Sequence, residues 1–354
     1  MKTEDDSAGN TVLCEIRGRA GVITLNRPEA LNALTHPMVR RIDEALSTWE
    51  RDPAVEQVLI RGAGERGLCA GGDIRAIYDD AKAGATASVG FWHDEYRLNA
   101  RIARCPTPYV ALMDGIVMGG GVGVSAHGSV RVVTERSRVA MPETGIGFVP
   151  DVGGTYLLAR APGGLGTHLA LTGAAVGAAD AVLCGLADHF VPAARLEDLT
   201  AALAAAPVHE VLPRYAATPP LGELAGRRHW IDHCYAADTV EEIVERLLRH
   251  GDPAAKEAAE TILAKSPTAL KITLAALRRA AALGALEEVL AQEFRVSCRA
   301  LVLPDLVEGI RAQVVDKDRN PRWSPAALEA VTDAEVERHF APLGAGRELH
   351  FPQG

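Results

Sequence analysis

Two glycine-rich stretches of the sequence could bind an oxygen atom that gains negative charge during a reaction. Residues 69–73 and 118–123 each follow an expected strand and precede an expected helix. Glycine has no Cβ, so a ligand can approach the backbone closely, and the first N–H groups of a helix have no partner within the helix. Two such amides aimed at one point would form an oxyanion hole. Tight turns with close helix–strand packing explain either stretch equally well when it is taken alone.

A third segment, residues 139–154, carries two carboxylates among glycines and apolar residues. Glu143 and Asp151 lie eight positions apart in it. In such surroundings a carboxylate is expected to have a raised pKa, and it can act as an acid, a base or a nucleophile. A second interpretation is that Glu143 caps a short helix and Asp151 caps the helix that begins near Gly153. The residues by themselves leave both interpretations open.

A dinucleotide site is the main competing interpretation of the second glycine stretch. Residues 121–126 fit the pattern G-x-G-x-x-A, and Glu143 follows Gly123 by 20 residues. However, residues 114–118 separate the strand from these glycines where a tight turn is required, and Glu143 follows Pro142 instead of ending a strand. Other catalytic motifs also fail: position 127 is His127, which breaks G-x-S-x-G. His229 and His233 lack the glutamate of H-E-x-x-H.

Composition excludes several classes of protein. The chain has 37 basic and 46 acidic residues, a net charge of −9, which disfavours binding to nucleic acid or to an anionic membrane surface. No apolar run is long enough to span a membrane. The acidic, polar start of the chain resembles neither a secretory signal nor a transit peptide, so a cytoplasmic location is expected. The six cysteines are too far apart in sequence for a metal or redox motif, which predicts free thiols and no cysteine-bound metal.

Strands alternate with helices in the first half of the chain. We expect strands at 12–16, 22–25, 55–61, 109–113, 130–134 and 138–141, and helices at 37–49, 74–83, 91–104 and 119–127. This order predicts an α/β fold with parallel pairing, in which ligands bind beyond the carboxyl ends of the strands.

The second half is predominantly helical. We expect helices at 196–206, 239–250, 254–265, 268–283 and 286–299, with a loop at 207–225. Thr239 is the expected N-cap of the second of these helices, and Gly251 follows its end. The predicted organisation is a flexible N-terminus at 1–10, a core with the substrate site at 11–192, a helical insertion at 193–265, and C-terminal helices and a tail at 266–354.

Taken together, these motifs resemble the crotonase (enoyl-CoA hydratase/isomerase) superfamily. The matching stretches are 23–28 (ITLNRP), 31–34 (LNAL), 69–73 (CAGGD), 114–115 (DG), 119–121 (GGG) and 142–143 (PE). The resemblance implies an α/β fold made of a spiral of ββα repeats, here with a helical C-terminal part, that binds an acyl-CoA. It also implies that the thioester oxygen lies between the backbone N–H groups of Gly72 and Gly120.

Within that superfamily the chain resembles the branch that hydrolyses short, branched 3-hydroxyacyl-CoA thioesters. Gly123 stands where hydratases carry their first catalytic glutamate, and Asp151 stands where they commonly carry glycine. The resemblance continues through 148–154 (FVPDVGG), 238–243 (DTVEEI), 266–271 (SPTALK), 308–312 (EGIRA), 316–318 (DKD) and 321–323 (PRW). It places Glu95 at the acyl group and implies 3-hydroxyisobutyryl-CoA, an intermediate of valine degradation, as the substrate. Glu29 departs from the pattern, since relatives often have a basic residue there.

The same resemblance assigns roles to the residues. Glu143 would attack the thioester carbonyl or activate a water, Asp151 would orient the 3-hydroxyl group, and Glu95 would line the pocket. No cofactor beyond the CoA of the substrate is expected, and a homo-oligomer is possible in this superfamily. Arg27 and Arg75 are candidates for binding the CoA phosphates by position only. The alternatives are an enoyl-CoA hydratase or isomerase that uses Glu143 alone, and an acyl-CoA-binding protein without turnover.

Overall fold

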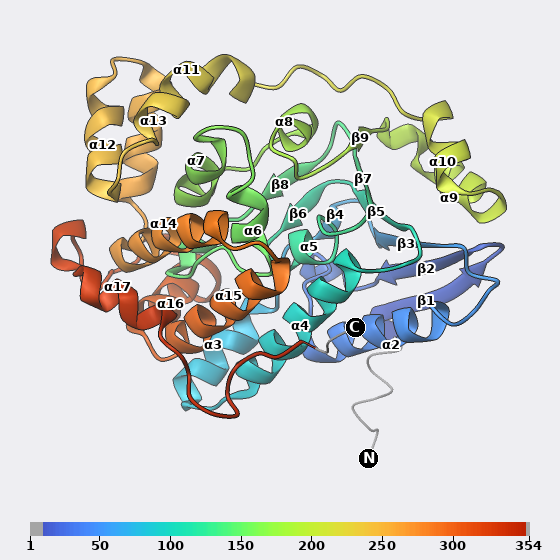
Figure 1. Ribbon diagram of the computed structural model, residues 1–354, viewed down its shortest axis with the longest axis horizontal. Coiled ribbons are helices and arrows are strands. Elements are labelled where there is room, and N and C mark those ends of the chain that lie inside the picture. Colours follow the sequence, from blue (N-terminus) through green and yellow to red (C-terminus); the bar gives the residue numbers. More distant parts are fainter. Residues whose placement is uncertain (1–9, 352–354) are drawn as a thin grey trace. The chain divides into compact units, whose positions relative to one another are not determined.

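A computed structural model describes residues 10–351, which form two compact units (Figure 1). Unit 1 comprises residues 10–72, 94–139 and 176–222, and unit 2 comprises residues 73–93, 140–175 and 223–351. The units are therefore interleaved along the chain, and their limits do not coincide with the contiguous boundaries expected at 192 and 265. Apart from Asn10, the predicted N-terminal segment lies outside the described residues.

The main sheet of unit 1 has the strand order β1-β2-β3-β5-β7-β9. Strands β1 (Val12–Arg17) and β2 (Ala20–Leu25) pair antiparallel. The remaining pairs of this sheet are parallel, which is the pairing that the sequence predicted. The other strands are β3 (Gln57–Gly62), β5 (Tyr109–Met113), β7 (Val130–Val133) and β9 (His189–Phe190). All residues of β2 and β5 are buried, which is typical of a parallel sheet covered on both faces.

A second, smaller sheet carries the glycine-rich stretches. Its order is β4-β6-β8, with β4 (Gly67–Cys69), β6 (Ile116–Met118) and β8 (Arg138–Ala140). Strands β4 and β6 are parallel, so residues 70–72 and 119–120 leave the same edge of this sheet. Three-residue strands are too short to produce a periodic pattern, and sequence analysis therefore missed β4 and β6.

The helices of unit 1 pack against its two sheets. They are α2 (His36–Trp49), α5 (Gly120–Gly123), α8 (Ala178–Leu183), α9 (Leu196–Ala205) and α10 (Val208–Val211). Leu199 and Leu203 of α9 join the buried cluster that contains Val22, Leu59 and Val110 of the sheet. The helix expected at 119–127 was overestimated, since it is only the single turn α5 followed by further turns.

Unit 2 is helical. Its helices are α3 (Ile74–Ala83), α6 (Gly154–Leu158), α7 (Leu165–Thr172), α11 (Leu224–Cys234), α12 (Val240–Arg249), α13 (Pro253–Leu263), α14 (Pro267–Ala282), α15 (Leu286–Ala300), α16 (Pro304–Ile310) and α17 (Asp333–Phe340). Helix α4 (Ala87–Ala103) begins in unit 2 and continues into unit 1. A buried cluster of Val149, Ile272, Val296, Val336 and Phe340 joins segments far apart in the sequence.

The predicted helix ends in the second half are largely confirmed. The Thr239 hydroxyl accepts from the Glu242 N–H at 3.1 Å as the N-cap of α12, and Gly251 has a φ of +85° just beyond that helix. The loop expected at 207–225 was only partly right, because it contains α10 and the start of α11.

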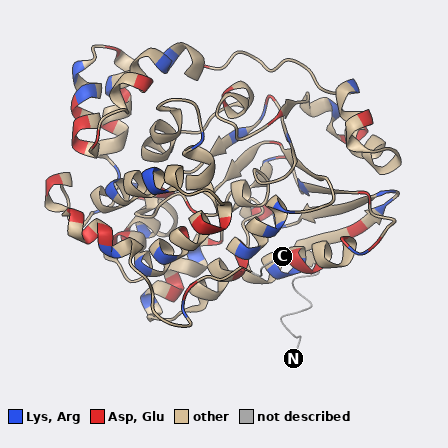
Figure 2. Cartoon of the chain, in the orientation of Figure 1, with Lys and Arg blue, Asp and Glu red and all other residues tan. Residues whose placement is uncertain are grey.

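Helix α12 carries charged residues of both signs, whereas β2 and β5 carry none (Figure 2). None of the helices formed by the described residues has the length and apolar character that a bilayer crossing requires.

Candidate active site

Gly72, Gly120 and Glu95 meet in unit 1. A Cβ placed on Gly120 would lie 3.3 Å from the Gly72 nitrogen and 2.7 Å from Glu95 Oε1. The two predicted oxyanion-hole glycines are thus adjacent, and the Glu95 carboxylate reaches them from α4. Glu95 is buried, as expected for a residue that lines a pocket. Its proposed contact with substrate stays a prediction.

The segment 31–34 holds the first glycine in place. Asn32 is buried, and its Nδ2 donates to the carbonyls of Ala63 and Gly67, each at 3.0 Å, while its Oδ1 accepts from the Arg27 N–H at 2.9 Å. Next to it, the Leu34 N–H donates to the Gly71 carbonyl at 2.8 Å, and Leu34 forms a parallel bridge with Gly72. The Leu-Asn-Ala-Leu motif therefore fixes β4 and the residues that follow it as far as Gly72.

The second glycine stretch packs closely against the first. A Cβ on Gly121 would lie 2.3 Å from the Cys69 carbonyl oxygen, so only glycine permits this approach. The Ser125 hydroxyl donates to the Gly121 carbonyl at 2.6 Å, and the Tyr109 hydroxyl donates to the Val124 carbonyl at 2.9 Å. These bonds close the turn that presents the Gly120 N–H.

None of the cysteines forms a disulfide bond among the described residues. All six cysteines are free, as predicted. Burial raises the pKa of Cys69, which lies within the first glycine stretch, to about 12. That thiol therefore stays protonated at neutral pH and is a poor nucleophile. Among residues 10–351, no group of three or more His, Cys, Asp or Glu side chains is arranged to hold a metal ion.

Glu143 and Asp151 both lie in unit 2 and are both buried. Glu143 begins the short helix η2 (Glu143–Ile146), and its carbonyl accepts from the Phe148 N–H at 3.0 Å. Gly147 has a φ of +70°, and a Cβ there would lie 2.3 Å from the Asp305 carbonyl oxygen. The loop that follows Glu143 is therefore fixed against α16 by a position that requires glycine.

Neither carboxylate occupies the N-cap position that the helix-cap interpretation gave it. The N-cap of η2 is Pro142, and the N-cap of α6 is Gly153. The N–H groups of Gly153 and Thr155 at the start of α6 donate to Glu293 of α15, at 2.7 and 3.0 Å. The capping function that this interpretation gave to Asp151 is thus filled from another helix.

Glu293 was missed by sequence analysis. Its side chain is buried, and burial raises its pKa to about 8. The charge of Asp151 also raises this pKa, whereas the hydrogen bonds from Thr155 and Gly153 lower it. A signal existed in the sequence: Glu293 occupies the apolar stripe of α15 between Leu290 and Val296. An acidic residue at such a position requires hydrogen-bond partners.

The two sets of predicted residues thus belong to different units: Gly72, Gly120 and Glu95 to unit 1, Glu143 and Asp151 to unit 2. Of the two candidate phosphate ligands, Arg27 donates to the Ala33 carbonyl at 2.6 Å and Arg75 is exposed on α3. Phosphate binding by either stays a prediction.

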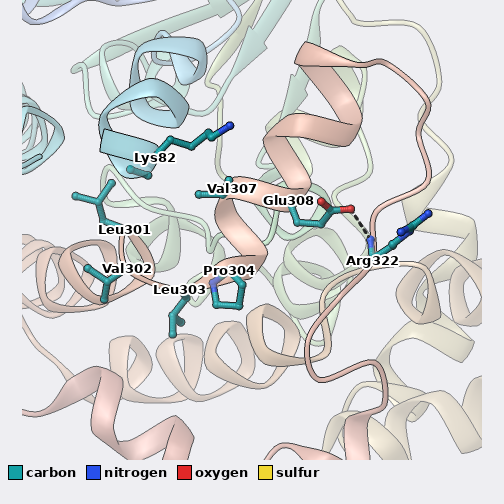
Figure 3. Close-up of a pocket in the computed structure, with 9 residues that line it drawn as sticks. Lys82, Leu301, Val302, Leu303, Pro304, Val307, Glu308 and Arg322 are labelled. Atoms are coloured by element: carbon teal, nitrogen blue, oxygen red, sulfur yellow. Dashed lines mark hydrogen bonds between the residues drawn. The ribbon is translucent and has the colours of Figure 1, made fainter. Parts of the chain in front are cut away.

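A separate cavity of about 550 Å³ in unit 2 contains none of the predicted site residues (Figure 3). Lys82 and Arg322 are its cationic residues, and the carboxylate of Glu308 accepts from the Arg322 N–H at 2.8 Å. Its wall is mainly apolar and is formed by Ala81, Leu301, Val302, Leu303, Pro304 and Val307.

Adjacent glycine amides at the edge of a small sheet, next to a larger parallel sheet, define an enzyme fold suited to stabilising an acyl oxyanion. The chain belongs to the enoyl-CoA hydratase/isomerase family, whose model matches residues 20–340. The crotonase fold predicted from the sequence is confirmed.

Three relatives illustrate the likeness. The chain is 47% identical to the mitochondrial 3-hydroxyisobutyryl-CoA hydrolase of Rattus norvegicus, over 96% of this chain and 91% of that protein. It is 56% identical to a carnitinyl-CoA dehydratase from Mycobacterium thermoresistibile, with a TM-score of 0.93 over 96% of this chain and 98% of that one. It is 46% identical to an enoyl-CoA hydratase from Rhodobacter sphaeroides 2.4.1, with a TM-score of 0.91 over 96% and 100% of the two chains.

Proposed function

We propose that this protein hydrolyses the thioester of 3-hydroxyisobutyryl-CoA to free CoA and 3-hydroxyisobutyrate, a step of valine degradation. The near full-length likeness to a hydrolase of that name supports the substrate. The observation that carries the choice of reaction is Gly123. This buried glycine of α5 has no side chain at the position where hydratases have their first catalytic glutamate. Addition of water to a double bond would lack one of its two acid–base groups.

The roles of the residues follow from the chemistry of thioester cleavage. The N–H groups of Gly72 and Gly120 would polarise the carbonyl and stabilise the oxyanion. A Glu143 carboxylate oxygen would then add to the carbonyl carbon, and the C–S bond would break to give a mixed anhydride and CoA thiolate. Water would hydrolyse the anhydride and restore Glu143. Alternatively, Glu143 would take a proton from a water that attacks the carbonyl directly. Asp151 would orient the 3-hydroxyl group and supply a proton to the departing thiolate, and Glu95 would line the acyl pocket.

Single-turnover hydrolysis in ¹⁸O-water separates the two routes. If a mixed anhydride forms, we expect ¹⁸O in the Glu143 carboxylate, because water can open the anhydride at the enzyme's acyl carbon. Mass spectrometry of the peptide that contains Glu143 measures the label. A fully unlabelled peptide after complete turnover would favour the general-base route.

An enoyl-CoA hydratase or isomerase is the second candidate, favoured by the likeness to the solved structures of an enoyl-CoA hydratase and a carnitinyl-CoA dehydratase. Two assays on one preparation decide between the functions. Free-thiol release with 3-hydroxyisobutyryl-CoA is expected for a hydrolase, and an absorbance change with an enoyl-CoA is expected for a hydratase. Enoyl-CoA turnover without thiol release would contradict our proposal.

Three further properties belong to the same proposal. We expect the reaction to need no cofactor, so that extensive dialysis against a chelator leaves the rate unchanged. A homo-oligomer is expected, which light scattering would measure. The cytoplasmic location remains a prediction, to be compared by cell fractionation with the mitochondrial location that the name of the rat relative states for that protein.

A further inference from the structure

We infer that Glu293 of α15 is a positioning residue for Asp151 in thioester hydrolysis. The inference rests on the proposed function, since it concerns the carboxylate to which that function assigns the 3-hydroxyl group. It is carried by the hydrogen bonds that join α15 to the chain just after Asp151.

Three donors converge on the Glu293 carboxylate. The Gly153 N–H donates to Oε2 at 2.7 Å, and the Thr155 N–H and hydroxyl donate to Oε1 at 3.0 and 2.5 Å. Glu293 is 1% exposed, so these bonds do not compete with bulk water. Every one of these partners is a donor, and an ionised carboxylate is a pure acceptor. An ionised Glu293 accepts all three bonds, whereas the amide of a glutamine would turn its NH2 group toward at least one of these donors.

The chain between Asp151 and these donors has an unusual path. Val152 has a φ of +53°, a conformation that β-branched residues rarely adopt, and Gly153 follows with a φ of +78°. The Gly154 N–H donates to the Asp151 carbonyl at 2.6 Å and closes a tight turn. Two consecutive left-handed residues are stable only when the surroundings fix them, and the Glu293 carboxylate accepts from the second of them.

The Asp151 charge also acts on Glu293, because a neighbouring negative charge raises the pKa of the Glu293 carboxyl group. Glu293 is therefore connected to Asp151 in two ways: by hydrogen bonds to the main chain that follows Asp151, and by electrostatic repulsion between the two carboxylates. A helix cap of purely structural value would use only the first connection, and its loss would lower stability without changing the chemical step selectively.

The test compares Glu293→Gln with a matched control on the same helix. The glutamine keeps the shape of the side chain but turns an acceptor into a donor that faces N–H groups. The control is Gln292→Met: Gln292 is also buried, and its Nε2 donates to the Ala276 carbonyl at 3.2 Å. If Glu293→Gln fails to fold, Thr155→Val replaces it, because this change removes the hydroxyl donor alone, and Thr155→Ser should restore the rate.

With 3-hydroxyisobutyryl-CoA at pH 9, above the raised pKa of Glu293, we expect Glu293→Gln to lower kcat by at least about 30-fold with KM within about threefold, and Thr155→Val to lower kcat by about three- to tenfold. Gln292→Met should keep kcat within about threefold of wild type. Hydrogen–deuterium exchange of the peptide covering 151–158 should be about tenfold faster in Glu293→Gln and unchanged in the control.

The inference is overturned if Glu293→Gln retains kcat within about threefold, or if Gln292→Met loses as much. A wild-type enzyme that does not hydrolyse the thioester would instead refute the proposed function. In that case hydrogen–deuterium exchange still tests whether Glu293 positions the segment that carries Asp151. Faster exchange confined to residues 151–158 in Glu293→Gln would support this role, and unchanged exchange would refute it.

Discussion

The proposed role of the Gly120 amide in binding an oxyanion requires that position 120 carry no side chain. A methyl group there would lie 2.7 Å from Glu95 Oε1 and 3.2 Å from Leu34 Cδ1, so the carboxylate or the amide would have to move. The same atom would lie 3.3 Å from the Gly72 nitrogen. At the residue scale, the proposed chemistry thus requires that residue 120 have no Cβ.

Gly120→Ala is expected to lower kcat by roughly 100- to 1,000-fold, the usual effect of losing an oxyanion-hole donor. Thiol release measures the rate, and circular dichroism checks the fold. Gly226→Ala is the control, because a Cβ on Gly226 has no atom within 4 Å and is expected to leave the rate unchanged. Equal rates for both variants would remove Gly120 from the site.

Glu143→Gln should abolish thioester cleavage while the fold is retained. The amide neither attacks a carbonyl nor accepts a proton from water, and the main-chain bond from Phe148 to the residue-143 carbonyl does not depend on the side chain. Thiol release and the melting temperature are measured together. A variant with a rate near that of wild type would exclude Glu143 from the mechanism.

The Asp151→Gly variant should have a much lower rate of thioester hydrolysis and nearly the same stability as wild type. Glu293 already binds the N–H groups of Gly153 and Thr155, so the start of α6 keeps its acceptors without the Asp151 side chain. The comparison of kcat with the melting temperature checks this expectation. A large drop in melting temperature with a preserved rate would mean that Asp151 has a structural role.

At the element scale, α15 stabilises α6 through a carboxylate whose ionisation is costly. Burial raises the pKa of Glu293 from 4.5 to about 8. A pKa that is higher in the folded than in the unfolded chain contributes stability that is present below about 4.5 and is lost as the pH rises through about 8. Glutamine at this position has no such dependence.

The free energy of unfolding of wild type should therefore fall relative to that of Glu293→Gln between pH 5 and pH 9, by on the order of a few kcal/mol. Chemical denaturation of both proteins at each pH measures the difference. Both folded proteins carry a neutral side chain at position 293 at pH 5, so the difference in the free energy of unfolding should develop as Glu293 ionises toward pH 9. If the difference in the free energy of unfolding between the two proteins stays constant from pH 5 to pH 9, the raised pKa of Glu293 is contradicted.

Local patterns predicted the long helices well. Helices α12, α14 and α15 lie within one or two residues of their predicted bounds, because amphipathic spacing and N-cap residues such as Thr239 act over a few neighbouring positions. The helix expected at 119–127 was too long and the strands β4 and β6 were missed, since glycine-rich turns and three-residue strands depend on partners elsewhere in the chain.

At the scale of the whole molecule, unit 2 depends on the C-terminal third of the chain. Val149, which lies between Glu143 and Asp151, is buried with Ile272, Val296 and Phe340. The loop that carries both carboxylates therefore packs on helices that come more than one hundred residues later. A chain shortened to the length of the predicted core would lack this support.

Deletion of residues 286–354 should abolish hydrolysis and the cooperative unfolding of unit 2. It removes Glu293 together with Val296, Val331, Val336 and Phe340 of the buried cluster, and exposed apolar residues such as Ile272 would favour aggregation. Thermal denaturation and thiol release test the shortened chain against the full one. Wild-type melting and turnover without these residues would show that unit 2 does not need them.

The sequence by itself determined the family, the α/β class, and the two glycines and two carboxylates proposed for the chemistry. These follow from residue types at fixed short spacings, which local sterics and hydrogen bonding make recognisable. Only the tertiary structure decided that the units interleave along the chain, that Asn32 braces the strand before Gly72, and that Glu293 binds the segment after Asp151. The hydrogen bonds from Gly153 and Thr155 to Glu293 span 140 and 138 residues. No local pattern encodes such a contact, because it exists only once packing has brought α15 against α6.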